Sequence, residues 1–309
     1  MRQPLLRALA LSAVVTTLAR GQPPNFDNTQ EHLLPVQGNT YMLAGAGGNT
    51  TLQVGKDGVL VVDTQYAEMA PKILSEIRKL SDKPIVWMVN THIDQDHSGG
   101  NAALAKLGRG PGPRPRIIAH ENVLNRMTLR VPNQPPVPDE ALPDDEYGTP
   151  QKDLFFNGEA VVIYHMPRAH TDGDSIVFFR RSDVVSVGDI FTPDRWPAID
   201  LARGGSVEGT LDALNYILTL TVPERYQDGG TLVVPGHGRI SNEADVVEYR
   251  NMLTIVRDRV QDLLNKGMTL EQVKAARPAR DYETEYSERG LWTKDMFVEA
   301  VYRSLNGNR

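Results

Sequence analysis

Residues 91–100 read Thr91-His92-Ile93-Asp94-Gln95-Asp96-His97-Ser98-Gly99-Gly100. Four side chains that can bind a metal, those of two histidines and two aspartates, fall within six positions of this stretch. An apolar run over 85–89 predicts a buried strand before it, and the pattern over 101–107 predicts a helix after it. Irregular backbone at the end of a strand can direct several side chains to one point. Since imidazole and carboxylate are ligands of zinc, iron and manganese, we predict a metal site in this turn.

Three more candidate ligands lie further along the chain, each just after an apolar strand pattern. They are His170 in the segment 167–174, Asp189 after Gly188, and His237 after Pro235 and Gly236. Small residues flank each of them, as expected where the backbone must approach a crowded site. Buried charges of this kind are very costly unless a cation neutralises them.

These four turns, in this order, resemble the metallo-β-lactamase superfamily. The metal signature of that family is a His-x-His-x-Asp-His turn, then a Gly/Ala-His-Thr, a Gly-Asp and a Pro-Gly-His turn. The strand pattern over 59–62 that ends at Asp63 matches a further family element, whose Asp supports the metal loop. The resemblance covers roughly residues 36–240, and the conjunction of four turns makes it specific. It implies an α/β fold, a four-layer αβ/βα sandwich of two mixed sheets flanked by helices, with the site at the edge between the sheets.

The resemblance also implies which side chains bind two divalent metal ions. Carried over position by position, His92, Asp94 and His170 would hold the first metal, and Asp96, His97 and His237 would hold the second. Asp189 would bridge both metals. Asp96 would also be the catalytic residue that orients the attacking hydroxide.

One position departs from the signature, because Asp94 stands where the family has its second histidine. A third carboxylate adds a negative charge and a harder oxygen ligand, so iron and manganese become credible beside zinc, which remains the first expectation. The alternative is that Asp94 binds nothing and the first site is empty or weak.

The resemblance implies a hydrolase that uses a hydroxide shared by two metals. We expect a small-molecule substrate with an amide, ester, lactone or β-lactam carbonyl. Two alternatives stay open: a phosphodiesterase or nuclease type of hydrolase, and a di-iron or redox-accessory protein of the envelope without hydrolase activity. Arg195 and Trp196, in the loop 192–206, are candidate substrate contacts, although the Trp could equally anchor that loop. The proline-rich, aperiodic segment 131–150 is predicted to be a long loop, either a lid over the site or disordered.

The whole chain has 309 residues, 40% hydrophobic, with a formal net charge of −6 and no cysteine. The absence of cysteine excludes disulfides and thiolate ligands, and no basic run indicates nucleic-acid binding. Residues 1–21 read as a signal peptide with cleavage before Gln22, which predicts a periplasmic or secreted protein without a stable membrane anchor. We expect one domain over 22–309, with a core at about 36–240 and a helical C-terminal extension over 241–309. The sequence does not indicate an oligomeric state.

Overall fold

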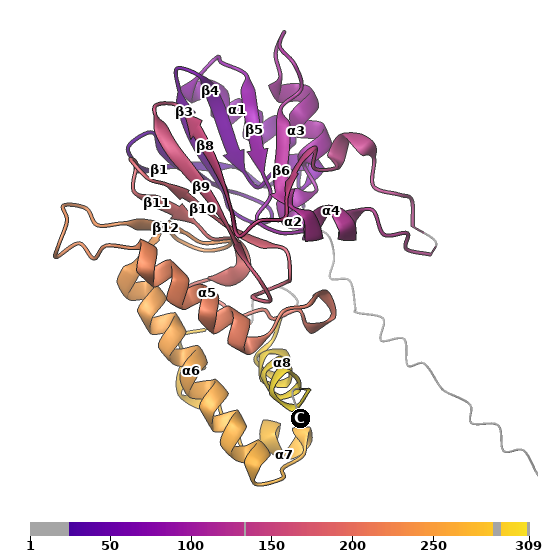
Figure 1. The fold of residues 1–309 in the computed structure, drawn as a ribbon, viewed down its shortest axis with the longest axis vertical. Helices are drawn as coiled ribbons and strands as arrows, with labels where there is room; N and C mark the ends of the chain where they lie inside the picture. The colour runs from indigo at the N-terminus through magenta and orange to yellow at the C-terminus, as the bar shows by residue number, and fades with distance from the viewer. Residues whose placement is uncertain (1–24, 133, 287–291, 308–309) are drawn as a thin grey trace, which may run out of the picture.

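The computed structural model describes residues 25–132, 134–286 and 292–307. The expected signal peptide over 1–21 therefore lies outside the described residues. Two mixed β-sheets pack face to face and helices cover their outer faces, which confirms the predicted sandwich. Figure 1 shows α5, α6 and α8 gathered at one end of the view and α1 and α3 at the other.

The first sheet has seven strands in sequence order, antiparallel from β1 to β4 and parallel from β4 to β7. Gly58, with φ +135°, allows the tight hairpin that joins β3 to β4 in this sheet. The strands are β1 (His32–Gln37), β2 (Thr40–Ala44), β3 (Thr50–Gly55), β4 (Gly58–Val62), β5 (Ile85–Val89), β6 (Arg116–His120) and β7 (Asp145–Tyr147).

The second sheet has six strands in the order β13-β12-β11-β10-β9-β8. Its neighbours are antiparallel except for β11 and β12, which are parallel. The strands are β8 (Gln151–Phe156), β9 (Glu159–Met166), β10 (Asp174–Phe179), β11 (Val184–Ser186), β12 (Leu232–Val234) and β13 (Ser241–Asn242).

Three apolar clusters account for the four layers. Inward-facing residues of both sheets, Leu60 and Val177 among them, form the cluster between the sheets. Helices α1 (Ala70–Leu80) and α3 (Asn101–Gly108) cover the outer face of the first sheet, and their apolar side chains join those of β3 to β6 in a second cluster. The largest cluster lies outside the second sheet, so every sheet face is shielded from water.

The C-terminal helices belong to this largest cluster. Helices α5 (Val207–Leu220), α6 (Glu243–Asn265) and α8 (Lys294–Asn306) all bury apolar residues in it, and the short α7 (Leu270–Ala275) adds Val273. Helix α6 begins with a capping box between Asn242 and Asp245, and α7 begins with a second capping box between Thr269 and Gln272. The helical extension is therefore packed on the second sheet.

Several elements were not anticipated. Strands β1, β7, β8 and β13 and helix α4 (Glu121–Met127) have no counterpart in the sequence expectation. The segment 131–150 is not wholly a loop, because β7 pairs with β6 in parallel and a short 3₁₀ turn spans Asp139–Ala141. Strand β7 has only three residues, and so short a run has no hydrophobic periodicity that could reveal it in the sequence.

Backbone hydrogen bonds join the two sheets at one edge. The N–H of Gly48 donates to the carbonyl of Asp96 at 2.9 Å, and the N–H of Asn49 donates to the carbonyl of Gly236 at 2.7 Å. From the other sheet, the N–H of Ser175 donates to the carbonyl of Thr91 at 2.8 Å. The turns that carry the candidate ligands are therefore fixed against one another. Among the described helices, none has the length and apolar character needed to cross a membrane.

Candidate metal centre

Asp63 orients the two histidines of the 91–100 turn. Its buried carboxylate accepts hydrogen bonds from Nδ1–H of His97 (2.7 Å), from the hydroxyl of Thr91 (2.7 Å) and from the N–H of Thr91 (2.8 Å). The Thr91 hydroxyl, having donated to Asp63, accepts from Nδ1–H of His92 at 2.9 Å. Both imidazoles thus carry their proton on Nδ1 and direct the lone pair of Nε2 away from Asp63.

His170 is held in the same way from the second sheet. Its Nδ1–H donates to the carbonyl of Ala198 at 2.9 Å, so its Nε2 faces Asp94, whose Oδ2 lies 3.2 Å away within hydrogen-bond distance. Thr171 fixes the turn, because its N–H and hydroxyl both donate to the buried carboxylate of Asp174. Three imidazoles are therefore oriented with Nε2 toward the same region, where each could bind a cation once that nitrogen has no proton.

The predicted ligands converge in two groups. His92, Asp94, His170 and Asp189 form one group, in which the potential ligand atoms all lie within 4.8 Å of one another. Asp96, His97 and His237 form the other, under the same limit. Within this second group, Nε2 of His237 lies 3.2 Å from Oδ2 of Asp96. All seven side chains named from the sequence are therefore brought together.

Asp189 lies between the two groups. Its Oδ2 is 4.0 Å from Nε2 of His92, whereas its Oδ1 is 3.2 Å from Nε2 of His97 and 3.6 Å from Nε2 of His237. One carboxylate oxygen faces each group, which is the arrangement that a bridging ligand needs.

The residues present fit a pair of cations. Nε2 of His92 and Oδ1 of Asp189 are buried and have no hydrogen-bond partner among the described residues. A buried polar atom without a partner is costly. A cation in the first group would satisfy Nε2 of His92, and a cation in the second group would satisfy Oδ1 of Asp189. Imidazole and carboxylate ligands in two groups suit zinc, iron or manganese.

The charges at the site are strongly coupled. Burial acts to raise the pKa of Asp94, but the hydrogen bond with His170 and the proximity of His92 hold it well below its usual range. Burial likewise acts to raise the pKa of Asp189, and the nearby charges of His237 and His97 lower it well below its usual range. Burial acts to lower the pKa of His170, yet its contact with Asp94 raises that pKa to about 10. Since a metal must displace such protons, cation binding is expected to weaken as the pH falls.

Two glycines allow this crowding. A Cβ on Gly236 would lie 2.1 Å from Oδ1 of Asp189, and one on Gly48 would lie 2.2 Å from Cε1 of His97. Any side chain at either position would displace a ligand, which explains the glycine in the Pro-Gly-His turn in physical terms.

Two residues beside the ligands were not predicted. The guanidinium of Arg203 donates through Nη1 to Oδ1 of Asp94, from a position 109 residues further along the chain. The ring of Tyr66 packs beside Gly47, and the charge of Asp96 helps burial to raise its pKa. The sequence contains no local signal for either contact, since both depend on how distant loops meet.

The two candidate substrate contacts lie in different surroundings. Trp196 is 2% exposed and packs with the rings of Phe297 (centroids 5.6 Å apart) and Tyr286 (5.4 Å), so it anchors its loop in the apolar core. It is not among the side chains that converge on Asp189. Arg195 is half-buried, and its Nε has no hydrogen-bond partner among the described residues.

The segment that follows α4 shares an apolar cluster with the metal turn. Ile93, between two of the candidate ligands, packs against the cluster that includes Val123 and Met127 of α4, and Val137 and Leu142 of the following segment pack against the same cluster. This part of 131–150 therefore lies near the metal turn.

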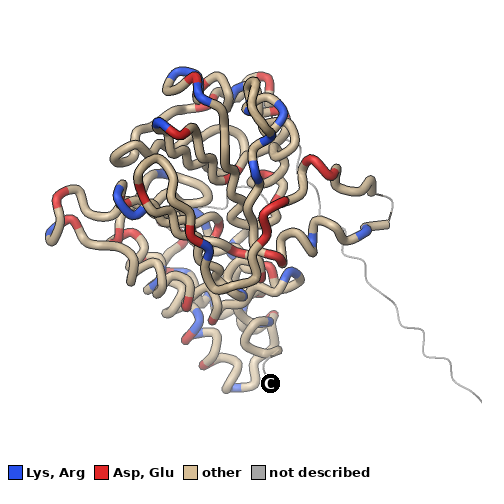
Figure 2. Tube along the Cα trace, turned by 45° about the horizontal axis from the view of Figure 1, so that its top comes forward, with Lys and Arg blue, Asp and Glu red and all other residues tan. Residues whose placement is uncertain are grey.

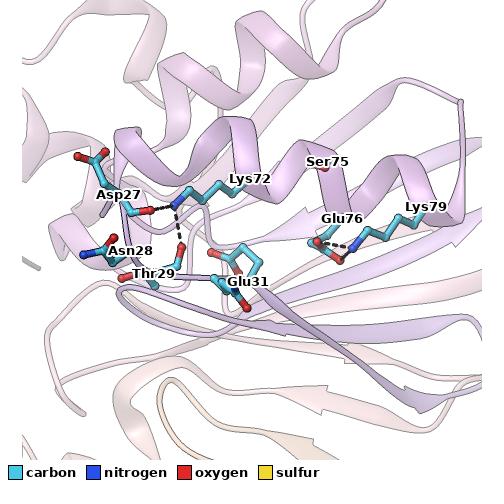
Figure 3. Close-up of a pocket in the computed structure, with 9 residues that line it drawn as sticks. Asp27, Asn28, Thr29, Glu31, Lys72, Ser75, Glu76 and Lys79 are labelled. Atoms are coloured by element: carbon cyan, nitrogen blue, oxygen red, sulfur yellow. Dashed lines mark hydrogen bonds and ion pairs between the residues drawn. The ribbon is translucent and has the colours of Figure 1, made fainter. Parts of the chain in front are cut away.

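Other features of the surface lie apart from the ligands. A polar hollow of about 550 Å³ lies between residues 27–31 and helix α1. Nζ of Lys72 donates there to the carbonyls of Asp27 and Thr29 (Figure 3). None of the seven ligands lines this hollow. Figure 2 shows lysine and arginine scattered among acidic residues along the described trace.

Comparisons with known proteins agree with this geometry. The family model described as "Metallo-beta-lactamase superfamily" matches residues 43–237. A linear primary-alkylsulfatase from Pseudomonas sp. (strain ATCC 19151) is 23% identical over 293 residues, covering 81% of this chain and 54% of that protein.

Solved structures show a similar fold. A stereoselective inverting sec-alkylsulfatase from Pseudomonas sp. has a TM-score of 0.64 at 19% identity, over 88% of this chain and 50% of that one. A metallo-beta-lactamase from Pontibacter korlensis has a TM-score of 0.57 at 16% identity, over 73% of this chain and 99% of that one. The chain thus spans about half the length of the alkylsulfatases that it matches.

Proposed function

This chain belongs to the metallo-beta-lactamase superfamily, and from that premise we propose that it is a hydrolase with two divalent metal ions, most readily zinc, at the Asp189 centre. The observation that carries the proposal is the position of Asp189, which directs one oxygen to His92 and the other to His97 and His237. A carboxylate shared in this way calls for two cations rather than one.

Each ligand has a defined role in this proposal. His92, Asp94 and His170 hold the first cation, Asp96, His97 and His237 hold the second, and Asp63 keeps His97 and His92 in the required tautomer. Metals at such a site lower the pKa of water and polarise the substrate. Asp96 has the most exposed side chain of the seven ligands, at 26%. It is therefore placed to accept a hydrogen bond from the attacking water and to orient it.

The substrate that we propose is a small molecule with an ester, amide, lactone or β-lactam carbonyl, met outside the cytoplasm. Export rests on the signal-like sequence of residues 1–21. Arg195 is a candidate contact for an anionic group of the substrate, since its buried Nε has no hydrogen-bond partner among the described residues.

A second candidate substrate is a sulfate ester. One observation favours it: the alkylsulfatase matches extend over 81% and 88% of the chain, whereas that to the Pontibacter korlensis structure covers 73%. The same two-metal centre could serve both reactions, because each is a hydrolysis in which water attacks and a leaving group departs.

A substrate panel tests these proposals. Chelator-stripped protein, reloaded with zinc, manganese or iron, is assayed on p-nitrophenyl acetate, nitrocefin, a γ-lactone, dodecyl sulfate and bis-p-nitrophenyl phosphate. We expect turnover of a carbonyl substrate that requires metal and is lost in Asp189→Ala. Turnover of dodecyl sulfate alone would favour the second candidate, and turnover of the phosphodiester alone would indicate a nuclease type. A fully loaded protein inactive on every substrate would favour an accessory, non-hydrolytic role.

A further inference from the structure

Asp94 divides its carboxylate between two kinds of partner. Its Oδ2 faces the imidazoles of the first metal group, at 3.5 Å from Nε2 of His92 and 3.2 Å from Nε2 of His170. Its Oδ1 instead accepts a hydrogen bond from Nη1 of Arg203. Only one oxygen of Asp94 is therefore directed at the metal group.

Arg203 is itself fixed in place. Its Nε donates to Oδ2 of Asp200 at 2.7 Å, and its backbone N–H donates to Oδ1 of the same residue at 2.9 Å. The N–H of Asp200 in turn donates to the carbonyl of His170 at 2.9 Å. The guanidinium is thus connected to the turn that carries a ligand of the first metal, and its planar fork suits two carboxylates at once.

The charges make this contact informative. The signature that this chain resembles has a neutral imidazole at the position of Asp94, so the aspartate adds one negative charge. A guanidinium is always positive, and the Arg203–Asp94 ion pair returns the formal charge of that position to zero. The pair is half-buried, with 30% and 22% of the two side chains exposed, so solvent screens it less than a surface pair.

We propose that Arg203 is a positioning residue, which holds Asp94 as a one-oxygen ligand and offsets the charge that it brings to the first metal group. The inference rests on the proposed function, because Asp94 has a ligand role only when cations bind. Without Arg203, Oδ1 of Asp94 loses its hydrogen-bond donor in the stripped protein, while Oδ2 keeps its contact with His170. The carboxylate of Asp94 is also free to bind a cation through both oxygens, which favours manganese over zinc.

A double-mutant cycle tests the proposal on the full chain. The variants are Arg203→Met, Asp94→Asn and the two combined. Arg126→Met serves as the matched control, because Arg126 forms a similarly exposed pair with Asp172 that does not involve a ligand. Melting temperatures are measured after stripping with a chelator. Bound metal is measured after dialysis against equal concentrations of zinc and manganese.

We expect Arg203→Met to lower the melting temperature of the stripped protein by a few degrees, and to have little effect once Asp94 is Asn. Arg126→Met should lower the melting temperature by the same amount whether residue 94 is Asp or Asn. The share of bound manganese should rise several-fold in Arg203→Met but not in the double variant. Arg203→Lys should recover part of both effects, since it keeps the charge but lacks the fork.

An equal loss of stability from Arg203→Met in both backgrounds would show that Arg203 only anchors the loop through Asp200, and an unchanged manganese share would also overturn the inference. A parent protein that binds fewer than two cations would contradict the proposed function instead. The coupling between Arg203 and Asp94 in stripped protein is measured independently of that result.

Discussion

Asp63→Asn changes the hydrogen bonds that orient the candidate ligands and leaves the ligand side chains themselves in place. Asp63 has φ +61°, in the left-handed region where Asn is well tolerated and Ala is not, so the backbone should be unchanged. The amide oxygen of Asn can still accept from the N–H of Thr91. Its NH₂ group, however, replaces the oxygen that now accepts from His97 and from the Thr91 hydroxyl.

The magnitude follows from those two contacts. A hydrogen bond to a charged group contributes roughly 1.5–3 kcal/mol, so the variant should lose about 3 kcal/mol of unfolding free energy. If the new NH₂ donates to Nδ1 of His97, the imidazole proton moves to Nε2, which is the atom that faces Asp189. Loss of a supporting carboxylate of this kind lowers metal affinity by about 10–100-fold.

The assay is zinc competition with a chromophoric chelator, together with urea unfolding. Asp174→Asn is the control, because Asp174 is also buried and accepts from a backbone N–H and a hydroxyl, but from no imidazole. It should leave the second zinc affinity unchanged. If Asp63→Asn binds both zinc ions as tightly as the parent, the role that we assign to the Asp63 hydrogen bonds is wrong.

Substitutions at three other positions test further parts of the account. By elemental analysis, Asp94→Ala should fold and retain one of two cations. Asp94→His should retain both and prefer zinc more strongly. Two cations in the Ala variant would show that Asp94 is no ligand. Burial raises the pKa of Glu31 from 4.5 to about 7. The folded chain therefore holds that proton more tightly than the unfolded chain does. This contribution to stability is complete below about pH 4.5 and is lost as the pH rises through about 7. Glu31→Gln stays neutral and should therefore melt above the parent at pH 8 and with it at pH 4, and equal melting at both values would contradict the pKa. Trp196→Ala should lose about 3–5 kcal/mol of stability in urea unfolding while both zinc ions remain bound, and a loss of bound zinc without a loss of stability would place the indole at the site instead.

The ligands could be predicted from the sequence because each lies in a turn directly after a strand. The apolar runs of β5, β9, β11 and β12 identify those strand ends, and small residues such as Gly236 indicate the close approach of backbone that the structure shows. The layered fold followed from the family resemblance and from the alternation of strands and helices.

The remainder depends on contacts between distant segments. Arg203 meets Asp94 because the turn at Asp200 is tied to the His170 turn, and nothing near Arg203 in the sequence records that contact. Strand β7 lies in the proline-rich segment and forms by pairing with β6. Its three extended residues are too few to give a periodic signal. Trp196 looked like a substrate contact because of its position in a loop, whereas its burial against Phe297 is set by a helix about 100 residues away.

The cation count per chain tests the central claim most directly. Stripped parent protein and His237→Ala are dialysed against zinc, and bound metal is measured by elemental analysis. The two ligand groups around Asp189 predict two zinc ions per chain in the parent and one in the variant, which loses a ligand of the second group only. A single zinc ion in the parent, or two in His237→Ala, would contradict the two-metal centre.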